Sequence, residues 1–593
     1  MALQARDAQE RKRHGRHYTP PELARFLARR ALRYAPPTGV LRVLDPACGD
    51  GELLLAVHRE IAASAPDAEM RLTGYDLDRQ AVEETAGRAA DLGVEIDCRA
   101  GDFLATSADL ADGSFDLIIS NPPYVRTQQL GGATAQLLSK QFGLRGRIDL
   151  THPFVAIAPR LLAAGGVLGL LCANRFLTTR AGANLRRILT GELTPVELYD
   201  LGDTKLFAAA VLPAITVALR ATGPTGCRYV SVYEELGVEP DCAVELFEAL
   251  AGDDACLVGV GGRVFAVEVG VLATGEIVAR DPATGGHAVA NPPNVGLVSA
   301  EPTSQAVDGV RFDRHGDTAW RMSRPSVDHW LGRIADRTWR SFGEAARIRV
   351  GIKTTADRVF ISDRWDQMDP TPEPELLREL ITHHDLQPWR IAMARGTRVL
   401  YPYDLLQPRR TPIDLTDFPC AAAYLQSHEQ ALSGRRYVLD GGRKWFEIWV
   451  PQRPHLWGAP KLVFPDISER PRFALDRSGA VVNGDCYWIS LTDLGDSATD
   501  LAYLLMGVAN SALGLRFYDA VCGNRLYSGR RRWITQYVAR LPLPDPGCPA
   551  AGEVVRRVRA LLEDGVSVAD SGIDEVVEAA FGVSVDVADA DHR

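Results

Sequence analysis

The chain has 593 residues, of which 46% are hydrophobic and 24% are charged. That composition is ordinary for folded globular protein and excludes a disordered or fibrous chain, and the length predicts about three or four domains. The formal net charge is −10, so an anionic partner has to be bound by local basic patches rather than by the overall field.

The ten cysteines are scattered, with no C-x-x-C pair and no His/Cys cluster at zinc spacing. This pattern is typical of a reducing compartment, without disulfides or a structural metal. No apolar run reaches transmembrane length, and the charged N-terminus is not followed by a signal-type apolar stretch. We therefore expect a cytoplasmic protein that uses neither membrane nor metal.

The first expected helix follows a short polar N-terminus. Residues 1–16 are too few for a nuclease or another folded domain. Thr19 is expected to cap the helix, with Pro20 as the first helical residue and Glu22 as the capping-box partner.

A strand over Val40–Leu44 leads into the turn Asp45–Gly51, and a helix follows. A strand, a glycine-containing turn and a helix form the first half of a nucleotide-binding α/β unit. Gly49 and Gly51 let a ligand approach the backbone, and the helix N-terminus offers N–H groups to a carboxylate. The turn is neither G-x-G-x-x-G nor a P-loop. Asp45 repels phosphate but accepts from an ammonium group, so the methionine part of S-adenosylmethionine suits this turn better than a dinucleotide does.

The next two strands also end in acids. Arg71–Tyr75 ends at Asp76, a position from which a carboxylate binds two ribose hydroxyls. Val94–Asp97 leads to Asp102 and Phe103, where the carboxylate can accept from an adenine amino group while the ring packs on its face. Because parallel strands end at one edge of a sheet, these acids indicate one cofactor site.

Asn121–Tyr124 follows the apolar strand Phe115–Ser120. Two prolines end the strand, because neither offers a backbone N–H. The Asn121 amide, the carbonyls of Asn121 and Pro122 and the Tyr124 ring are thereby left at the carboxyl end of the strand, the edge at which open α/β sheets bind ligands.

These motifs, in this order, resemble those of the adenine-N6 DNA methyltransferases of the TaqI type, in which cofactor motifs precede the catalytic motif and a recognition domain follows. The resemblance covers residues 17–220 and is looser beyond residue 341. It implies an α/β fold, with a Rossmann-like S-adenosylmethionine-dependent methyltransferase domain on a mostly parallel sheet, followed by an α+β DNA-recognition domain. The TaqI enzyme itself carries glutamate where Asp45 and Asp76 stand.

The resemblance also implies the site residues. Those expected to bind the cofactor are Thr19, Asp45, Ala47, Cys48, Gly49, Asp76, Leu77, Asp102 and Phe103. Those expected to act in catalysis are Asn121, Pro122, Tyr124 and Phe207, the last two as aromatic rings against a base flipped out of the duplex.

Four segments are expected. Residues 1–225 form the catalytic domain, 226–340 a connector or inserted subdomain, 341–545 the DNA specificity domain, and 546–593 a peripheral helical tail. Two stretches of the specificity domain interleave arginine with aromatic residues, as phosphate and base contacts require. Their arginines are the predicted DNA contacts: Arg435, Arg436, Arg525, Arg530, Arg531 and Arg532.

The leading interpretation is a site-specific adenine-N6 methyltransferase of double-stranded DNA in a restriction–modification or related defence system, beside a cognate endonuclease or other defence proteins. Two alternatives stay open. One is a methyltransferase of a protein glutamine amide or an RNA guanine, since both groups share Asn-Pro-Pro-Tyr; they need no long recognition segment, which argues against them. The other is a DNA-binding modification subunit that is active only with partners.

Overall fold

The computed structural model describes residues 18–35, 39–124, 132–146, 148–204, 206, 212–221, 226–274, 276–277, 310–311, 320–522, 526 and 529–585. The chain forms two compact units. The N-terminal unit comprises Met1–Glu276, Val310–Pro325 and the short stretch Arg525–Gly529; the C-terminal unit comprises the remainder.

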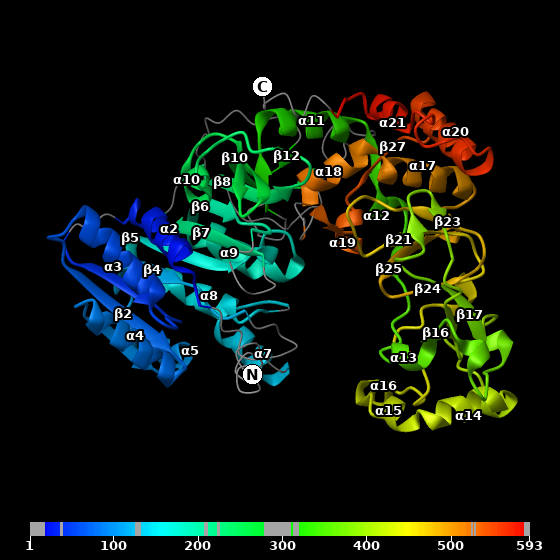
Figure 1. Ribbon diagram of the computed structural model, residues 1–593, viewed down its shortest axis with the longest axis horizontal. Coiled ribbons are helices and arrows are strands. Elements are labelled where there is room, and N and C mark those ends of the chain that lie inside the picture. The colour runs from blue at the N-terminus through cyan, green and yellow to red at the C-terminus, as the bar shows by residue number, and fades with distance from the viewer. Residues whose placement is uncertain are drawn as a thin grey trace, which may run out of the picture. The chain divides into compact units, whose positions relative to one another are not determined.

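One sheet of eleven described strands forms the centre of the N-terminal unit (Figure 1). Its strands are β1 (Leu41–Asp45), β2 (Met70–Asp76), β3 (Ile96–Ala100), β4 (Phe115–Ser120), β5 (Leu162–Ala173), β6 (Thr194–Asp200), β7 (Pro213–Leu219), β8 (Arg228–Glu235), β9 (Cys256–Val260), β10 (Arg263–Thr274) and β13 (Trp320–Ser323). The order is β13-β10-β8-β6-β7-β5-β4-β1-β2-β3, with β9 beside β10. Strands β3, β2, β1, β4 and β5 are parallel, and β7 is antiparallel to β5 and β6. The predicted α/β fold is confirmed.

Both faces of this sheet are buried. Val43 and Leu117 pack with α2 (Pro21–Leu32) and α3 (Glu52–Ser64) on one face. On the other, Leu44 and Ile118 pack with α8 (Thr151–Leu161) and α9 (Ala183–Gly191). Burial on both faces explains why the middle of these strands is apolar in the sequence, as at Leu117–Ile119 of β4.

The segment assigned to a connector or inserted subdomain contains β8, β9 and β10. In the structure β8 pairs in parallel with β6, and β10 pairs antiparallel with both β8 and β9. These residues therefore extend the sheet of the N-terminal unit.

The C-terminal unit is α+β, as predicted. One sheet has the order β15 (Ile348–Val350), β25 (Cys486–Ser490), β21 (Lys461–Pro465), β23 (Ala474–Asp476). A second has the order β16 (Ile361–Ser362), β20 (Arg398–Leu400), β17 (Leu377–Ile381), β24 (Val481–Val482). Residues of the first sheet belong to two hydrophobic cores, one shared with the C-terminal helices and one shared with the second sheet.

The C-terminal helices are not peripheral. One core of the first sheet also contains α17 (Ala498–Asn510), α18 (Ala512–Cys522), α20 (Pro549–Glu563) and α21 (Ile573–Phe581). Val558 of α20 and Phe581 of α21 are fully buried there, so the expectation of a peripheral tail is wrong for these two helices. Within the described part of the chain, no single helix is long and apolar enough to span a membrane, and the bent pair α17–α18 reaches that length and composition only when both helices are counted.

Candidate active site

Thr19 does not cap α2. The helix starts at Pro21 with Pro20 in the cap position, so Glu22 is its second residue, one short of the position that a capping box needs. The Thr19 hydroxyl instead accepts a hydrogen bond of 3.0 Å from Nδ2 of Asn121. The capping prediction is therefore wrong, and Thr19 lies beside the catalytic motif.

The turn between β1 and α3 is held by α4 (Arg79–Asp91). Gly51 has φ +79°, and a Cβ there would lie 2.5 Å from Cγ2 of Thr85. The Thr85 hydroxyl donates to the Gly49 carbonyl at 2.8 Å, and Arg88 donates to the Asp50 carbonyl at 2.7 Å. The turn thus needs glycine for its backbone and for its close packing. Sequence reasoning missed both side chains of α4.

Asp76 is fixed at the end of β2 by the backbone. Its Oδ2 accepts from the Gly49 N–H at 2.9 Å, and its Oδ1 accepts from the Asp78 N–H at 2.8 Å. Each carboxylate oxygen has two lone pairs, so both can accept a further hydrogen bond. Asp76 can therefore receive two ligand hydroxyls without moving.

Asp45 is the buried acid of the site, only 1% exposed. Its Oδ1 accepts from the Ala47 N–H at 3.1 Å, whereas Oδ2 has no hydrogen-bond donor among the described residues. Burial raises the pKa of Asp45 to about 7, against the opposing effects of the Ala47 N–H and the nearby Ser120 hydroxyl. The negative charges of Asp76 and Asp50 raise the pKa further. A ligand ammonium group would supply the missing donor and the missing positive charge.

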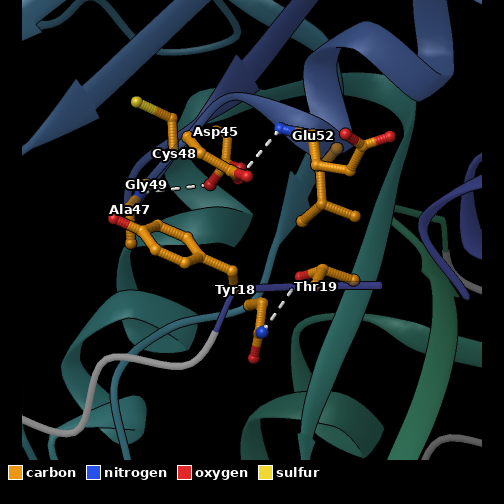
Figure 2. A pocket seen from close by; sticks show the side chains of 10 residues that line it. Tyr18, Thr19, Asp45, Ala47, Cys48, Gly49 and Glu52 are labelled. Carbon is orange, nitrogen blue, oxygen red and sulfur yellow. Dashed lines mark hydrogen bonds between the residues drawn. The ribbon is translucent and has the colours of Figure 1, made fainter. Parts of the chain in front are cut away.

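A pocket lies between this turn and the Asn121–Tyr124 motif (Figure 2). It is lined by Tyr18, Thr19, Asn121 and residues of the segment from Asp45 to Leu53. Figure 2 shows the Tyr18 ring beside the turn, and its Cδ1 and Cε1 atoms lie 3.4 Å from where a Cβ on Gly49 would stand. Sequence reasoning missed Tyr18, although an aromatic residue directly before Thr19 was visible.

The amide of Asn121 is bonded on both sides. Nδ2 donates to Thr19, and Oδ1 accepts from the Tyr124 hydroxyl. Burial raises the pKa of Tyr124 above its ordinary value, so the phenol stays protonated and can donate. The Pro123 carbonyl, two residues after Asn121, accepts a hydrogen bond of 3.3 Å from the Thr151 hydroxyl. The structure therefore places the predicted catalytic residue Asn121 and the glycine turn on the wall of one pocket.

Four predicted cofactor residues lie outside the pocket lining: Asp76, Leu77, Asp102 and Phe103. Asp102 caps the short helix that follows it by accepting from the Leu104 N–H at 2.9 Å. Phe103 is buried, with its ring centre 5.2 Å from that of Tyr75. Leu77 is 75% exposed at the end of β2. Phe207 and Arg525 lie outside the described residues.

The predicted DNA-contacting arginines of the C-terminal unit differ in their surroundings. Arg435 is buried, and its guanidinium donates to three backbone carbonyls at 2.8–3.1 Å. The prediction that Arg435 contacts DNA is wrong, because it stabilises the fold. Arg531 donates two hydrogen bonds of 2.7 Å to Asp519 and is mostly buried. Arg532 pairs with Asp466 at 3.1 Å and keeps half of its side chain exposed.

Arg436 and Arg530 are exposed. Arg436 precedes Tyr437, which is 45% exposed and meets Trp449 edge-to-face with ring centres 5.1 Å apart. Basic and aromatic side chains thus lie together on this segment.

Residues 72–207 match the family model of the Eco57I restriction-modification methylase. The chain is 32% identical to the Type II methyltransferase M.BanIII of Aneurinibacillus aneurinilyticus, over 97% of this chain and 98% of that protein. The chain belongs to the Type II restriction–modification DNA methyltransferases. The resemblance read from the motifs is thereby confirmed, and the fold and family imply S-adenosylmethionine as the methyl donor of this methyltransferase.

Two further proteins are similar to this chain, one over most of its length and one over a quarter of it. The Type IIL restriction-modification enzyme MmeI, solved in complex with DNA, shares its fold with a TM-score of 0.58 at 12% identity, over 95% of this chain and 72% of that chain. The release factor glutamine methyltransferase of Bordetella pertussis is 33% identical, but over only 25% of this chain and 49% of that protein.

Proposed function

We propose that this methyltransferase transfers a methyl group to N6 of an adenine flipped out of double-stranded DNA at one recognition sequence. The observation that carries this proposal is the position of Asn121. Its amide lies at the carboxyl end of β4, on the wall of the pocket that also contains the glycine turn and Asp45.

Adenine N6 is a weak nucleophile because its lone pair is delocalised into the ring. Oδ1 of Asn121 and the Pro122 carbonyl can each accept one of the amino hydrogens. Neither group is a base strong enough to remove a proton, so they act by directing the lone pair along the line of attack. Bound S-adenosylmethionine supplies the electrophilic methyl group.

Different residues around the pocket fit different chemical groups of S-adenosylmethionine. Asp45, whose Oδ2 has no donor among the described residues, would bind the ammonium group, and the N-terminus of α3 would face the carboxylate. Asp76 would accept from the ribose hydroxyls. Asp102 and Phe103 remain proposed contacts of the adenine, and Leu77 of the ribose side.

Base flipping requires stacking partners. Tyr124 would supply one face of the base, and Phe207 is proposed for the other. Losing one ring should lower the flipped population, because a base–aromatic contact is worth about 1–3 kcal/mol. The fluorescence of 2-aminopurine at the target position should rise when the protein binds a cognate duplex.

The C-terminal unit supports DNA rather than a glutamine amide or an RNA guanine as the substrate. It is proposed to read the recognition sequence, with Arg436, Arg530 and Arg532 as candidate contacts. A cognate endonuclease and a cytoplasmic location are parts of the same proposal.

The test is single-molecule sequencing of DNA from cells with and without the gene, using an Asn121→Ala strain as control. We expect N6-methyladenine in one sequence motif only in cells that carry the intact gene. N4-methylcytosine in the motif would refute the adenine assignment. Unmodified DNA in those cells, combined with activity of the purified protein only after a partner is added, would favour the modification-subunit alternative.

A further inference from the structure

Thr19 is held on a rigid support. It is 8% exposed and lies two residues before α2. That helix packs closely on β5, where a Cβ on Gly169 would meet both Leu27 and Ala31 at 3.3 Å. The helix is also tied to β6 by a buried ion pair, in which Nε of Arg30 donates to Glu197 at 2.7 Å. The Thr19 hydroxyl therefore has a fixed position relative to the sheet.

The Asn121 amide needs such a fixed partner. An amide can rotate by half a turn and exchange its oxygen for its NH₂ group, but only the oxygen can accept from an amino group. Thr19 accepts from Nδ2, so Oδ1 lies on the opposite side of the amide. There Oδ1 accepts from the Tyr124 hydroxyl.

We propose that Thr19 is a positioning residue for catalysis, which holds the Asn121 amide with its oxygen towards the reacting amino group. When the target base enters, its amino group replaces the Tyr124 hydroxyl on Oδ1, while the bond from Nδ2 to Thr19 stays in place. This inference rests on the proposed role of Asn121. It differs from the expectation that Thr19 binds the cofactor, because removing the Thr19 hydroxyl would slow the methyl-transfer step rather than weaken cofactor binding.

The chain offers matched variants for the test. Thr19→Val keeps the shape of the side chain but removes the acceptor, and Thr19→Ser keeps the hydroxyl. Single-turnover methylation of a cognate duplex measures the chemical step, and calorimetry with S-adenosylmethionine measures cofactor binding separately. Melting temperatures report folding, and Thr19→Ala is a second variant without the hydroxyl if Thr19→Val folds poorly.

We expect Thr19→Val to lower the single-turnover rate about tenfold, consistent with the loss of one hydrogen bond that orients a reacting group. Thr19→Ser should restore most of the rate, and the cofactor dissociation constant should change less than about twofold. A wild-type rate in both variants that lack the hydroxyl would overturn the proposal. So would a Thr19→Ser enzyme as slow as Thr19→Val, or a rise in the cofactor dissociation constant that matches the loss of rate.

The same assay separates this inference from the function on which it rests. If wild-type protein places no methyl group on adenine N6, the proposed function fails. If wild type methylates adenine, Asn121→Ala does not, and Thr19→Val is as fast as wild type, only the role of Thr19 fails.

Discussion

Asp45→Asn should stabilise the N-terminal unit and weaken cofactor binding at the same time. Burial raises the pKa of this carboxyl from the ordinary 3.8 to about 7. At about 1.36 kcal/mol per pKa unit, the difference corresponds to about 4 kcal/mol of unfavourable free energy for the buried charge. Asparagine has nearly the same shape and carries no charge, so the variant avoids this cost.

The sign of the pH dependence follows from proton binding. Between pH 3.8 and about 7 the folded protein keeps the Asp45 proton that the unfolded chain releases, so the contribution of Asp45 to stability falls as pH rises through this window. Above about pH 7 Asp45 is ionised in both the folded and the unfolded chain, so its contribution to stability falls no further. Asp45→Asn should therefore match wild type near pH 3, below both pKa values, and be more stable by up to about 4 kcal/mol at pH 8.

Cofactor affinity should change in the opposite direction. The ammonium group needs the ionised carboxylate, so wild-type affinity should fall as pH drops below about 7, and Asp45→Asn should bind weakly at every pH. Urea titrations that follow the N-terminal unit at both pH values, together with calorimetry, measure the two effects. A variant that is less stable than wild type at pH 8, or that binds S-adenosylmethionine with wild-type affinity, would refute the reasoning.

Three further predictions concern other parts of the molecule. Asp76→Ala should raise the cofactor KM strongly and leave DNA affinity nearly unchanged, because each hydrogen bond from a ribose hydroxyl to this charged acceptor is worth about 1.5–3 kcal/mol; unchanged calorimetric binding would contradict it. Arg530→Ala should weaken DNA binding and lower its salt dependence by about one unit of slope without changing the melting temperature, whereas Arg531→Ala should lower the melting temperature. Filter binding at two salt concentrations and thermal melts distinguish the two variants. Identical behaviour would count against a DNA contact at Arg530 and a structural role at Arg531. Gly51→Ala should destabilise the protein by at least about 1–3 kcal/mol, because the residue has φ +79° and a Cβ would clash with a threonine of α4; Gly87→Ala, in open space on that helix, is the control, and equal unfolding midpoints would disprove the clash.

Local patterns in the sequence predicted the strands around the candidate active site. The strand at Phe115–Ser120 is mostly apolar because both of its faces are buried, and two prolines end it at a definite residue. The acids Asp45 and Asp76 follow their strands directly, so their place at one edge of the sheet required only that the strands be parallel. Such features depend on neighbours in the chain, which the sequence displays.

Contacts between distant segments were decided by the tertiary structure. The local sequence of Thr19 fits a helix cap, but its partner Asn121 is 102 residues away. Arg435 and Arg436 are adjacent and equally basic, yet one lies buried among backbone carbonyls and the other is exposed. The sequence alone predicts a peripheral tail for the C-terminal helices, although they complete a core whose other members come from residue 327 onwards. In each case the free energy of burial depends on what packs around the side chain, and a linear pattern does not contain that information.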